Sequence, residues 1–132
     1  MGLRETYQKR VPRRLNYEDL DITSGLAVST DIFVGGRYLS AIDILGDSWD
    51  TANLTFQASP TSVDSDFMNV YDDCGNEYAV TVAAERHVIL NADMFSGIRF
   101  LRVRSGTSGT PVAQTAARVL RVWLVDPASL VQ

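Results

Sequence analysis

The stretch from Ala117 to Asp126, ARVLRVWLVD, decides the fold class, because apolar residues recur at every second position. From Leu120 to Leu124 these apolar residues fall on one face of an extended chain, whereas Arg121 and Trp123 fall on the other. Alternation with a period of two is typical of a strand with one buried face. The stretch therefore predicts a β-strand whose second face carries an arginine and a tryptophan.

Similar segments precede this one along most of the chain. In ANLTFQAS, residues 52–59, we expect Leu54, Phe56 and Ala58 to face inward and the intervening Asn53, Thr55 and Gln57 to face outward. Turn formers separate the segments, among them Gly35-Gly36 and the DDCGN stretch at 72–76. Strands are predicted at residues 31–34, 37–45, 52–59, 67–71, 78–83, 87–91, 98–105 and 117–126.

About eight short strands without a helical pattern between them predict an antiparallel arrangement, since parallel strands need long crossover connections. The predicted fold class is all-β, an antiparallel β-sandwich of the jelly-roll type that spans residues 31–127. The ADMFSG segment at 92–97 is expected to form at most one helical turn. Residues 128–132 are interpreted as a short C-terminal tail.

Residues 1–30 do not alternate, and Pro12 interrupts their one stretch that is compatible with a helix. We interpret them as an extended N-terminal arm that packs on its own domain or on a neighbouring subunit. Residues 1–14 hold five basic residues and one acid, whereas residues 15–132 hold seven arginines and fifteen acids. A basic arm of net charge +4 thus precedes a body of net charge −8.

Length and composition indicate one globular domain: the chain has 132 residues, of which 45% are hydrophobic and 21% charged. No apolar run approaches the roughly 20 residues of a membrane span, so no membrane association is expected. The single cysteine, Cys74, excludes an internal disulfide and a zinc site with several cysteines. We expect the chain to fold in a reducing cytosol.

The small-residue stretch SGTSGTPVAQ, residues 105–114, is a candidate for a phosphate-binding loop. A Walker loop needs GxxxxGK[ST] followed by a helix, and this stretch has no lysine and precedes a predicted strand. Neither GxGxxG nor the GxSxG nucleophile motif occurs in the chain. We interpret the stretch as a mobile or partner-contacting hairpin loop between the last two strands.

Other candidates for catalysis or metal binding are weak. A Cys74–His87 pair is conceivable as nucleophile and base, but Cys74 lies within a predicted tight turn. The acids at 64–66 and 72–73 offer calcium ligands without EF-hand spacing, and turn formation explains them equally well. We therefore expect no enzyme activity, no metal and no cofactor.

Two further features leave alternatives open. The aromatic residues Trp49, Tyr71, Tyr78, Phe100 and Trp123 either pack in the core or line a sugar-binding platform. The basic arm fits a nucleic acid or an acidic protein surface, and the acidic body favours the protein partner. The predicted contact residues of the arm are Leu3, Arg4, Tyr7, Lys9, Arg10, Val11, Arg13, Arg14 and Leu15.

Three segments within 48–125 carry a resemblance: SWDTANLTFQASPTS (48–62), NVYDDCGNEYAVTV (69–82) and FSGIRFLRVRSGTSGTPVAQTAARVL (95–120). They resemble a family of small β-sandwich proteins encoded among the structural genes of tailed bacteriophages and prophages. The residues that fill the family's motif positions are Trp49, Ala52, Leu54, Thr55, Phe56, Tyr71, Asp72, Gly75, Asn76, Glu77, Leu101, Arg104, Ser105, Gly106 and Thr107.

The resemblance implies a virion component that is assembled in the host bacterial cytoplasm, and it assigns no catalytic residue. Our leading hypothesis is a non-enzymatic capsid decoration (cement) protein. Its expected partners are the major capsid protein or other virion proteins and sister copies in a homo-oligomer. A neck, tail or fibre-base protein and a carbohydrate-binding module for host attachment are the alternatives.

Overall fold

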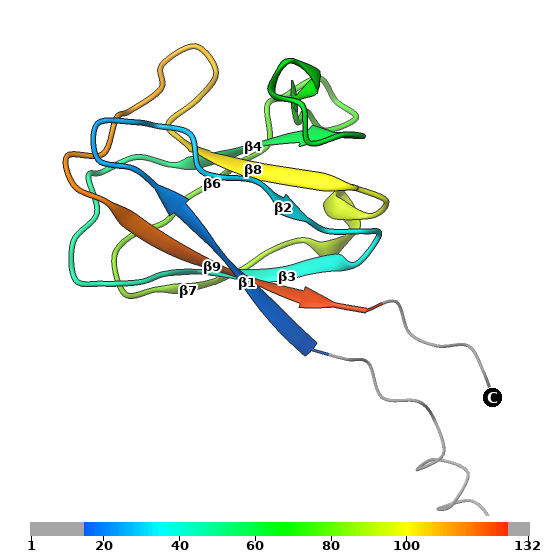
Figure 1. Cartoon of the computed structure of the whole chain (residues 1–132), viewed down its shortest axis with the longest axis horizontal. Coiled ribbons are helices and arrows are strands. Elements are labelled where there is room, and N and C mark those ends of the chain that lie inside the picture. The colour runs from blue at the N-terminus through cyan, green and yellow to red at the C-terminus, as the bar shows by residue number, and fades with distance from the viewer. Residues whose placement is uncertain (1–14, 127–132) are drawn as a thin grey trace, which may run out of the picture.

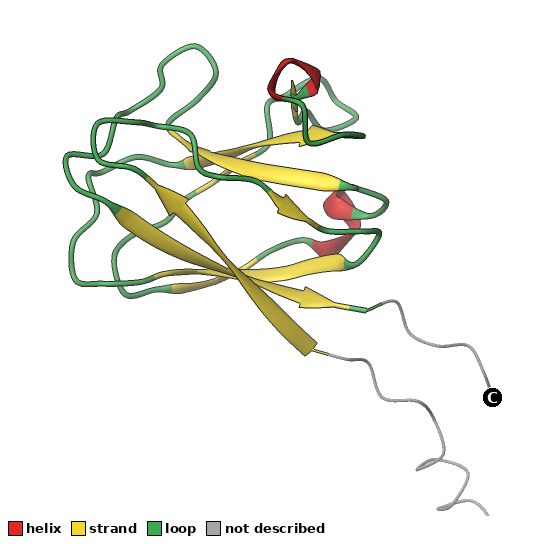
Figure 2. Ribbon diagram, viewed as in Figure 1, coloured by secondary structure: helices red, strands yellow, loops and turns green. Residues whose placement is uncertain are grey.

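The computed structural model describes residues 15–126, which form nine strands and two short 3-10 turns, with no α-helix in that range (Figures 1 and 2). Within these residues no helix has the length and apolarity that a membrane crossing requires. The elements are β1 (Leu15–Ile22), β2 (Ile32–Phe33), β3 (Tyr38–Ile44), β4 (Leu54–Ser59), η1 (Asp64–Asp66), β5 (Met68–Asn69), β6 (Ala79–Val80), β7 (His87–Ile89), η2 (Ala92–Phe95), β8 (Phe100–Ser105) and β9 (Arg118–Val125).

The strands form two antiparallel sheets that face each other (Figure 1). One sheet has the order β1-β9-β3-β7, and the other has the order β2-β8-β4-β5, with β6 also paired to β4. Successive strands from β1 to β4 and from β7 to β9 change sheet each time, which is the arrangement of a jelly roll in which β5 and β6 share one position. The predicted all-β sandwich is confirmed.

The core lies between the two sheets and is built from the alternate positions that the sequence indicates. Leu120, Val122 and Leu124 of β9 are fully buried, as are Leu54 and Phe56 of β4. Burial of each such side chain contributes about 1.5–3 kcal/mol to stability. Towards β7, the rings of Phe56, Tyr78 and Phe95 pack with centroids 4.9–5.8 Å apart.

The first strand corrects the predicted boundary of the domain. Residues 15–30 were expected to belong to an irregular arm, but β1 pairs with β9 along its whole length, from Leu15 opposite Val125 to Ile22 opposite Arg118. Leu20 and Ile22 are fully buried in the core. The sandwich therefore begins at Leu15 and not at residue 31. The remaining arm residues, 1–14, and the predicted tail, 128–132, lie outside the described residues.

The connection between β8 and β9 also differs from the prediction. It is not a hairpin loop, because β8 and β9 belong to different sheets. It is also anchored to the sandwich by backbone hydrogen bonds. The N–H of Gly106 donates to the carbonyl of Asn53 (2.7 Å), and the N–H of Val112 donates to the carbonyl of Ser105 (2.8 Å). Gly106 has φ +91°, and a Cβ atom there would lie 2.5 Å from the carbonyl oxygen of Thr110. The start of this connection thus requires glycine.

We predict that Gly106→Ala lowers the free energy of unfolding by about 1–3 kcal/mol or more, because alanine strains the positive φ and clashes with the backbone. Gly109→Ala in the same connection is the control, since its Cβ would meet no atom within 4 Å. Urea unfolding of both variants measures the difference. Equal stabilities would contradict the explanation.

Candidate interaction surface

The outer face of the four-stranded sheet carries two rows of side chains that run across the strands. The register aligns Asp19, Arg121, Asp43 and His87 in one row. The neighbouring row consists of Tyr17, Trp123, Ala41 and Ile89. Both rows point away from the core because the alternating positions of β9 point into it.

The first row is an alternation of opposite charges. Arg121 donates from Nε to Asp19 Oδ1 (3.0 Å), and its guanidinium lies over the ring of Tyr17, 4.4 Å from the centroid. The hydrogen bond to Asp19 raises the pKa of Arg121. Asp43 accepts from Trp123 Nε1 (2.7 Å) through one oxygen and pairs with His87 Nδ1 through the other. The row fixes the orientation of the aromatic side chains beside it.

The second row places apolar area in solvent. Tyr17 is 51% exposed and Ile89 80% exposed, and the ring of Tyr17 lies 5.3 Å from that of Trp123, centroid to centroid. Exposed aromatic and aliphatic side chains beside an arginine are typical of the centre of protein interfaces. We call the two rows together the outer-face surface. The predicted outward position of Arg121 and Trp123 is confirmed, whereas the contributions of β1 and β7 were missed.

The arm contacts predicted from the sequence can be placed only at their end. Residues 1–14 lie outside the described residues, and Leu15 starts β1 opposite Val125. Since Tyr17 follows two residues later in the same strand, the arm joins the sandwich at the end of the sheet that carries the second row.

The motif residues of the family resemblance meet on the other sheet, around Arg104. This arginine is 5% exposed and donates to Thr55 Oγ1 (3.1 Å), Asn69 Oδ1 (2.9 Å) and Glu77 Oε2 (2.7 Å). Thr55 was expected to face solvent, but it is fully buried beneath these groups and donates to the carbonyl of Gly106 (2.8 Å). The cluster holds the 70–78 turn and the β8–β9 connection on the sheet.

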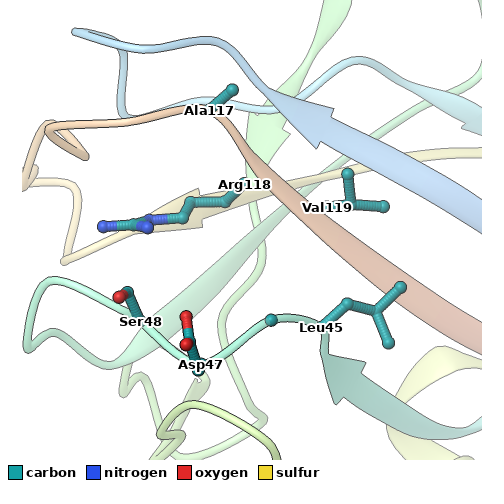
Figure 3. Close-up of a pocket in the computed structure, with 7 residues that line it drawn as sticks. Leu45, Asp47, Ser48, Ala117, Arg118 and Val119 are labelled. Atoms are coloured by element: carbon teal, nitrogen blue, oxygen red, sulfur yellow. The ribbon is translucent and has the colours of Figure 1, made fainter.

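A second polar cluster lies beside an open pocket of about 430 Å³ between residues 45–48 and 117–119 (Figure 3). In Figure 3 the Arg118 side chain points from β9 towards the loop that contains Ser48. Its guanidinium donates to Asp50 Oδ1 (2.6 Å) and to Oε1 of the fully buried Gln114 (3.0 Å). The bond from Arg118 lowers the pKa of Asp50. Both bonds tie the two loops together.

The residues considered for catalysis do not converge. Cys74 lies in the exposed 72–76 turn, which follows β5 on the five-stranded sheet, whereas His87 begins β7 on the four-stranded sheet. Asp72 Oδ1 accepts from the backbone N–H groups of Cys74 and Asn76, each at 2.9 Å, so this carboxylate stabilises the turn. The predicted turn is confirmed.

The acids considered as calcium ligands have protein partners of their own. Asp64 pairs with Arg102 (2.5 Å), and Asp66 accepts from Thr61 Oγ1 (2.5 Å). In the exposed 72–76 turn, one possible ligand atom each of Asp72, Asp73 and Cys74 lies within 4.8 Å of the others. Exposed groups of acidic residues are common in proteins without a bound metal.

The five aromatic residues considered as a sugar platform are likewise distributed over the molecule. Trp49 donates to the carbonyl of Ala52 (3.1 Å) and packs with Tyr78 against the core. Phe100 packs against Phe33 with tilted rings whose centroids are 5.2 Å apart, on the other sheet from Trp123. Of the two tryptophans, Trp123 alone lies on the outer-face surface.

Fold and surface together define a small jelly-roll β-sandwich whose four-stranded sheet has an open aromatic and charged face. Among solved structures it is similar to the crystal structure of the SPBc2 prophage-derived protein YomS, with a TM-score of 0.50 and 11% identity. The match covers 88% of this chain and 98% of that one. The likeness lies in the fold. No family model and no curated protein sequence matches the chain.

We predict that Arg104→Met lowers the free energy of unfolding by about 3–5 kcal/mol, because it leaves the largely buried Glu77 without its partner. Arg121→Met is the matched control, since that ion pair is partly exposed and exposed pairs contribute about 1 kcal/mol or less. Denaturant unfolding at neutral pH compares the two. A loss at Arg104 no larger than at Arg121 would refute the structural role of the cluster.

Asp50 predicts a dependence of stability on pH. The hydrogen bond from Arg118 holds its folded-state pKa below the ordinary value of 3.8, so the unfolded chain takes up the proton first as the pH falls. The stabilisation is therefore complete above 3.8 and is lost as the pH falls through the folded-state pKa. We expect the stability difference between wild type and Asp50→Asn to be constant at neutral pH and to shrink below 3.8. Thermal unfolding between neutral and acid pH measures it, and a difference independent of pH would contradict the assignment.

Proposed function

We propose that this protein is a non-enzymatic structural component of a tailed-phage particle, and more specifically a capsid decoration protein. Two independent likenesses support a phage origin: the motif segments within 48–125, and the fold shared with a prophage-derived protein. In the proposed role, the N-terminal arm and the edges of the sandwich together bind the shell and sister copies.

The outer-face surface carries this proposal. It combines exposed Tyr17 and Ile89 with Trp123 and Arg121 on one rigid sheet, where packing and hydrogen bonds hold their positions. Preformed aromatic anchors reduce the entropy that is lost on binding. The basic arm ends at residue 14, three residues before Tyr17, so the arm and this surface are able to contact one partner together.

The charge distribution supports a protein partner. The +4 arm attracts acidic surfaces, whereas the −8 remainder of the chain repels the phosphate backbone of DNA. A neck, tail or fibre-base position would use the same contacts, so the position in the particle is a separate question from the mode of binding.

Deletion of residues 1–14 is the direct test of the arm. We expect the truncated chain to fold, because the described sandwich begins at Leu15, and to lose binding to particles that were assembled without this protein. Cosedimentation with those particles measures binding, and removal of residues 128–132 is the control. Unimpaired binding of the chain without its arm would refute the arm's role.

Labelling of the protein in intact particles separates the two positions. Label distributed over the shell supports decoration, whereas label at a single vertex or on the tail supports the neck or tail assignment and overturns decoration.

Host glycan binding is the second candidate function, favoured by the position of Trp123 on the outer face beside Tyr17 and His87. Trp123→Ala should then abolish binding to a glycan array, whereas Trp49→Ala should retain it, because Trp49 packs against the core and bonds to Ala52. An array without signal for the wild-type protein eliminates this candidate.

A further inference from the structure

Strand β1 forms one edge of the four-stranded sheet and has β9 on its inner side only. On its outer side, the backbone N–H of Asp21 donates to Thr30 Oγ1 (3.0 Å), and the carbonyl of Asp21 accepts from the backbone N–H of Thr30 (2.9 Å). Because alternate residues of a strand direct both backbone groups to the same side, Tyr17 and Asp19 present theirs at this edge. They have no partner there among residues 15–126. Such an edge is a template for a further strand.

This edge is acidic. The strand itself, which has eight residues, contains Glu18, Asp19 and Asp21. Asp31 directly follows Thr30, the residue that bonds to Asp21. Within the described part of the chain, Asp19 is the member of this group that has an ion-pair partner, namely Arg121. A strand that pairs with β1 therefore gains most if it is basic.

The chain itself contains such a segment. Residues 1–14 include Arg4, Lys9, Arg10, Arg13 and Arg14 and carry a net charge of +4. A return of the arm onto the β1 of its own chain would need a tight turn immediately before Leu15. Residues 11–14, VPRR, contain no Gly, Asn or Asp, whereas the favoured two-residue turns require positive φ. The composition thus argues against a two-residue hairpin return and favours pairing with another molecule.

We propose that the N-terminal arm of one copy pairs with the β1 edge of a second copy, so that exchanged arms link sister subunits. Backbone hydrogen bonds to Tyr17 and Asp19 supply affinity, and Glu18 and Asp21 select the basic partner. This inference rests on the arm's role in the proposed function and identifies a sister copy as the partner of that arm.

The test uses the purified full-length chain without particles, so that its outcome is independent of particle binding. Sedimentation velocity over a dilution series should show self-association at low salt. High salt should weaken it, because exposed charges are screened within about 10 Å at 0.1 M ionic strength. A chain that stays monomeric at every concentration at low salt overturns the proposal.

Charge reversal locates the contact. Glu18→Lys with Asp21→Lys should weaken association at least tenfold. Asp47→Lys with Asp73→Lys is the control of equal charge change, at exposed acids in loops that form no ion pair among the described residues. Far-ultraviolet circular dichroism verifies that all variants fold. Equal effects of the edge and control pairs would contradict the assignment.

A mixing experiment distinguishes arm exchange from other modes of association. Arg10→Glu, Arg13→Glu and Arg14→Glu in the arm should also abolish self-association. When this variant is mixed with Glu18→Lys/Asp21→Lys, its acidic arm faces a basic edge, and a mixed oligomer should form. A mixture that stays monomeric overturns the pairing of arm and edge.

Two further results would identify a different occupant of the edge. Amide protection of Tyr17 and Asp19 that is independent of concentration and lost on deletion of residues 1–14 would place each arm on its own chain. A monomeric wild type whose binding to particles is abolished by Glu18→Lys/Asp21→Lys would assign the edge to a shell protein. Either result refutes arm exchange, and the second leaves the proposed function intact.

Discussion

The pairing of β9 with both β1 and β3 is the constraint on which the rest of the structure depends. Its inward residues fill the centre of the core, and its outward residues, Arg121 and Trp123, are the centre of both surface rows. Because side chains alternate between faces, a shift of register by one residue would bury these two and expose Leu120, Val122 and Leu124. Core stability and the geometry of the outer-face surface therefore have one common origin.

The two sheets differ in what covers their outer faces, and Arg104 explains the difference. Its bonds to Thr55, Asn69 and Glu77 hold a turn and a long connection over the five-stranded sheet, so polar residues there are buried. A buried arginine is costly unless its donors are satisfied, and three side-chain acceptors satisfy this one. Among the described residues, no comparable cover lies over the outer-face surface, where Ile89 is 80% exposed. The charged and aromatic rows of the four-stranded sheet therefore stay open to solvent.

The sequence predicted the sandwich because eight of the nine described strands alternate or lie between clear turn formers. It missed β1 because an edge strand buries only part of its length: Glu18 stands opposite the buried Val122 and is itself exposed. The Arg104 cluster was hidden for another reason. A period of two assigns Thr55 to an outer face, but it does not reveal that loops far along the chain cover that face. The two residues that β9 contributes to the surface, Arg121 and Trp123, were visible in one strand, whereas Tyr17 and Ile89 depended on pairings that only the fold establishes.

The acidic residues of β1 have two effects on the pairing of this edge strand with other chains. Identical β1 edges repel one another, because each would bring Glu18, Asp19 and Asp21 against the same residues, and this protects an eight-residue edge strand from indiscriminate pairing. The same carboxylates favour a basic partner, and residues 1–14 of the chain are a basic segment. In the proposed arrangement, one set of charges thus excludes edge-to-edge association and admits arm exchange. In that arrangement the separation of the basic residues 1–14 from the acidic β1 matters, because mixing their charges would remove both the repulsion and the attraction.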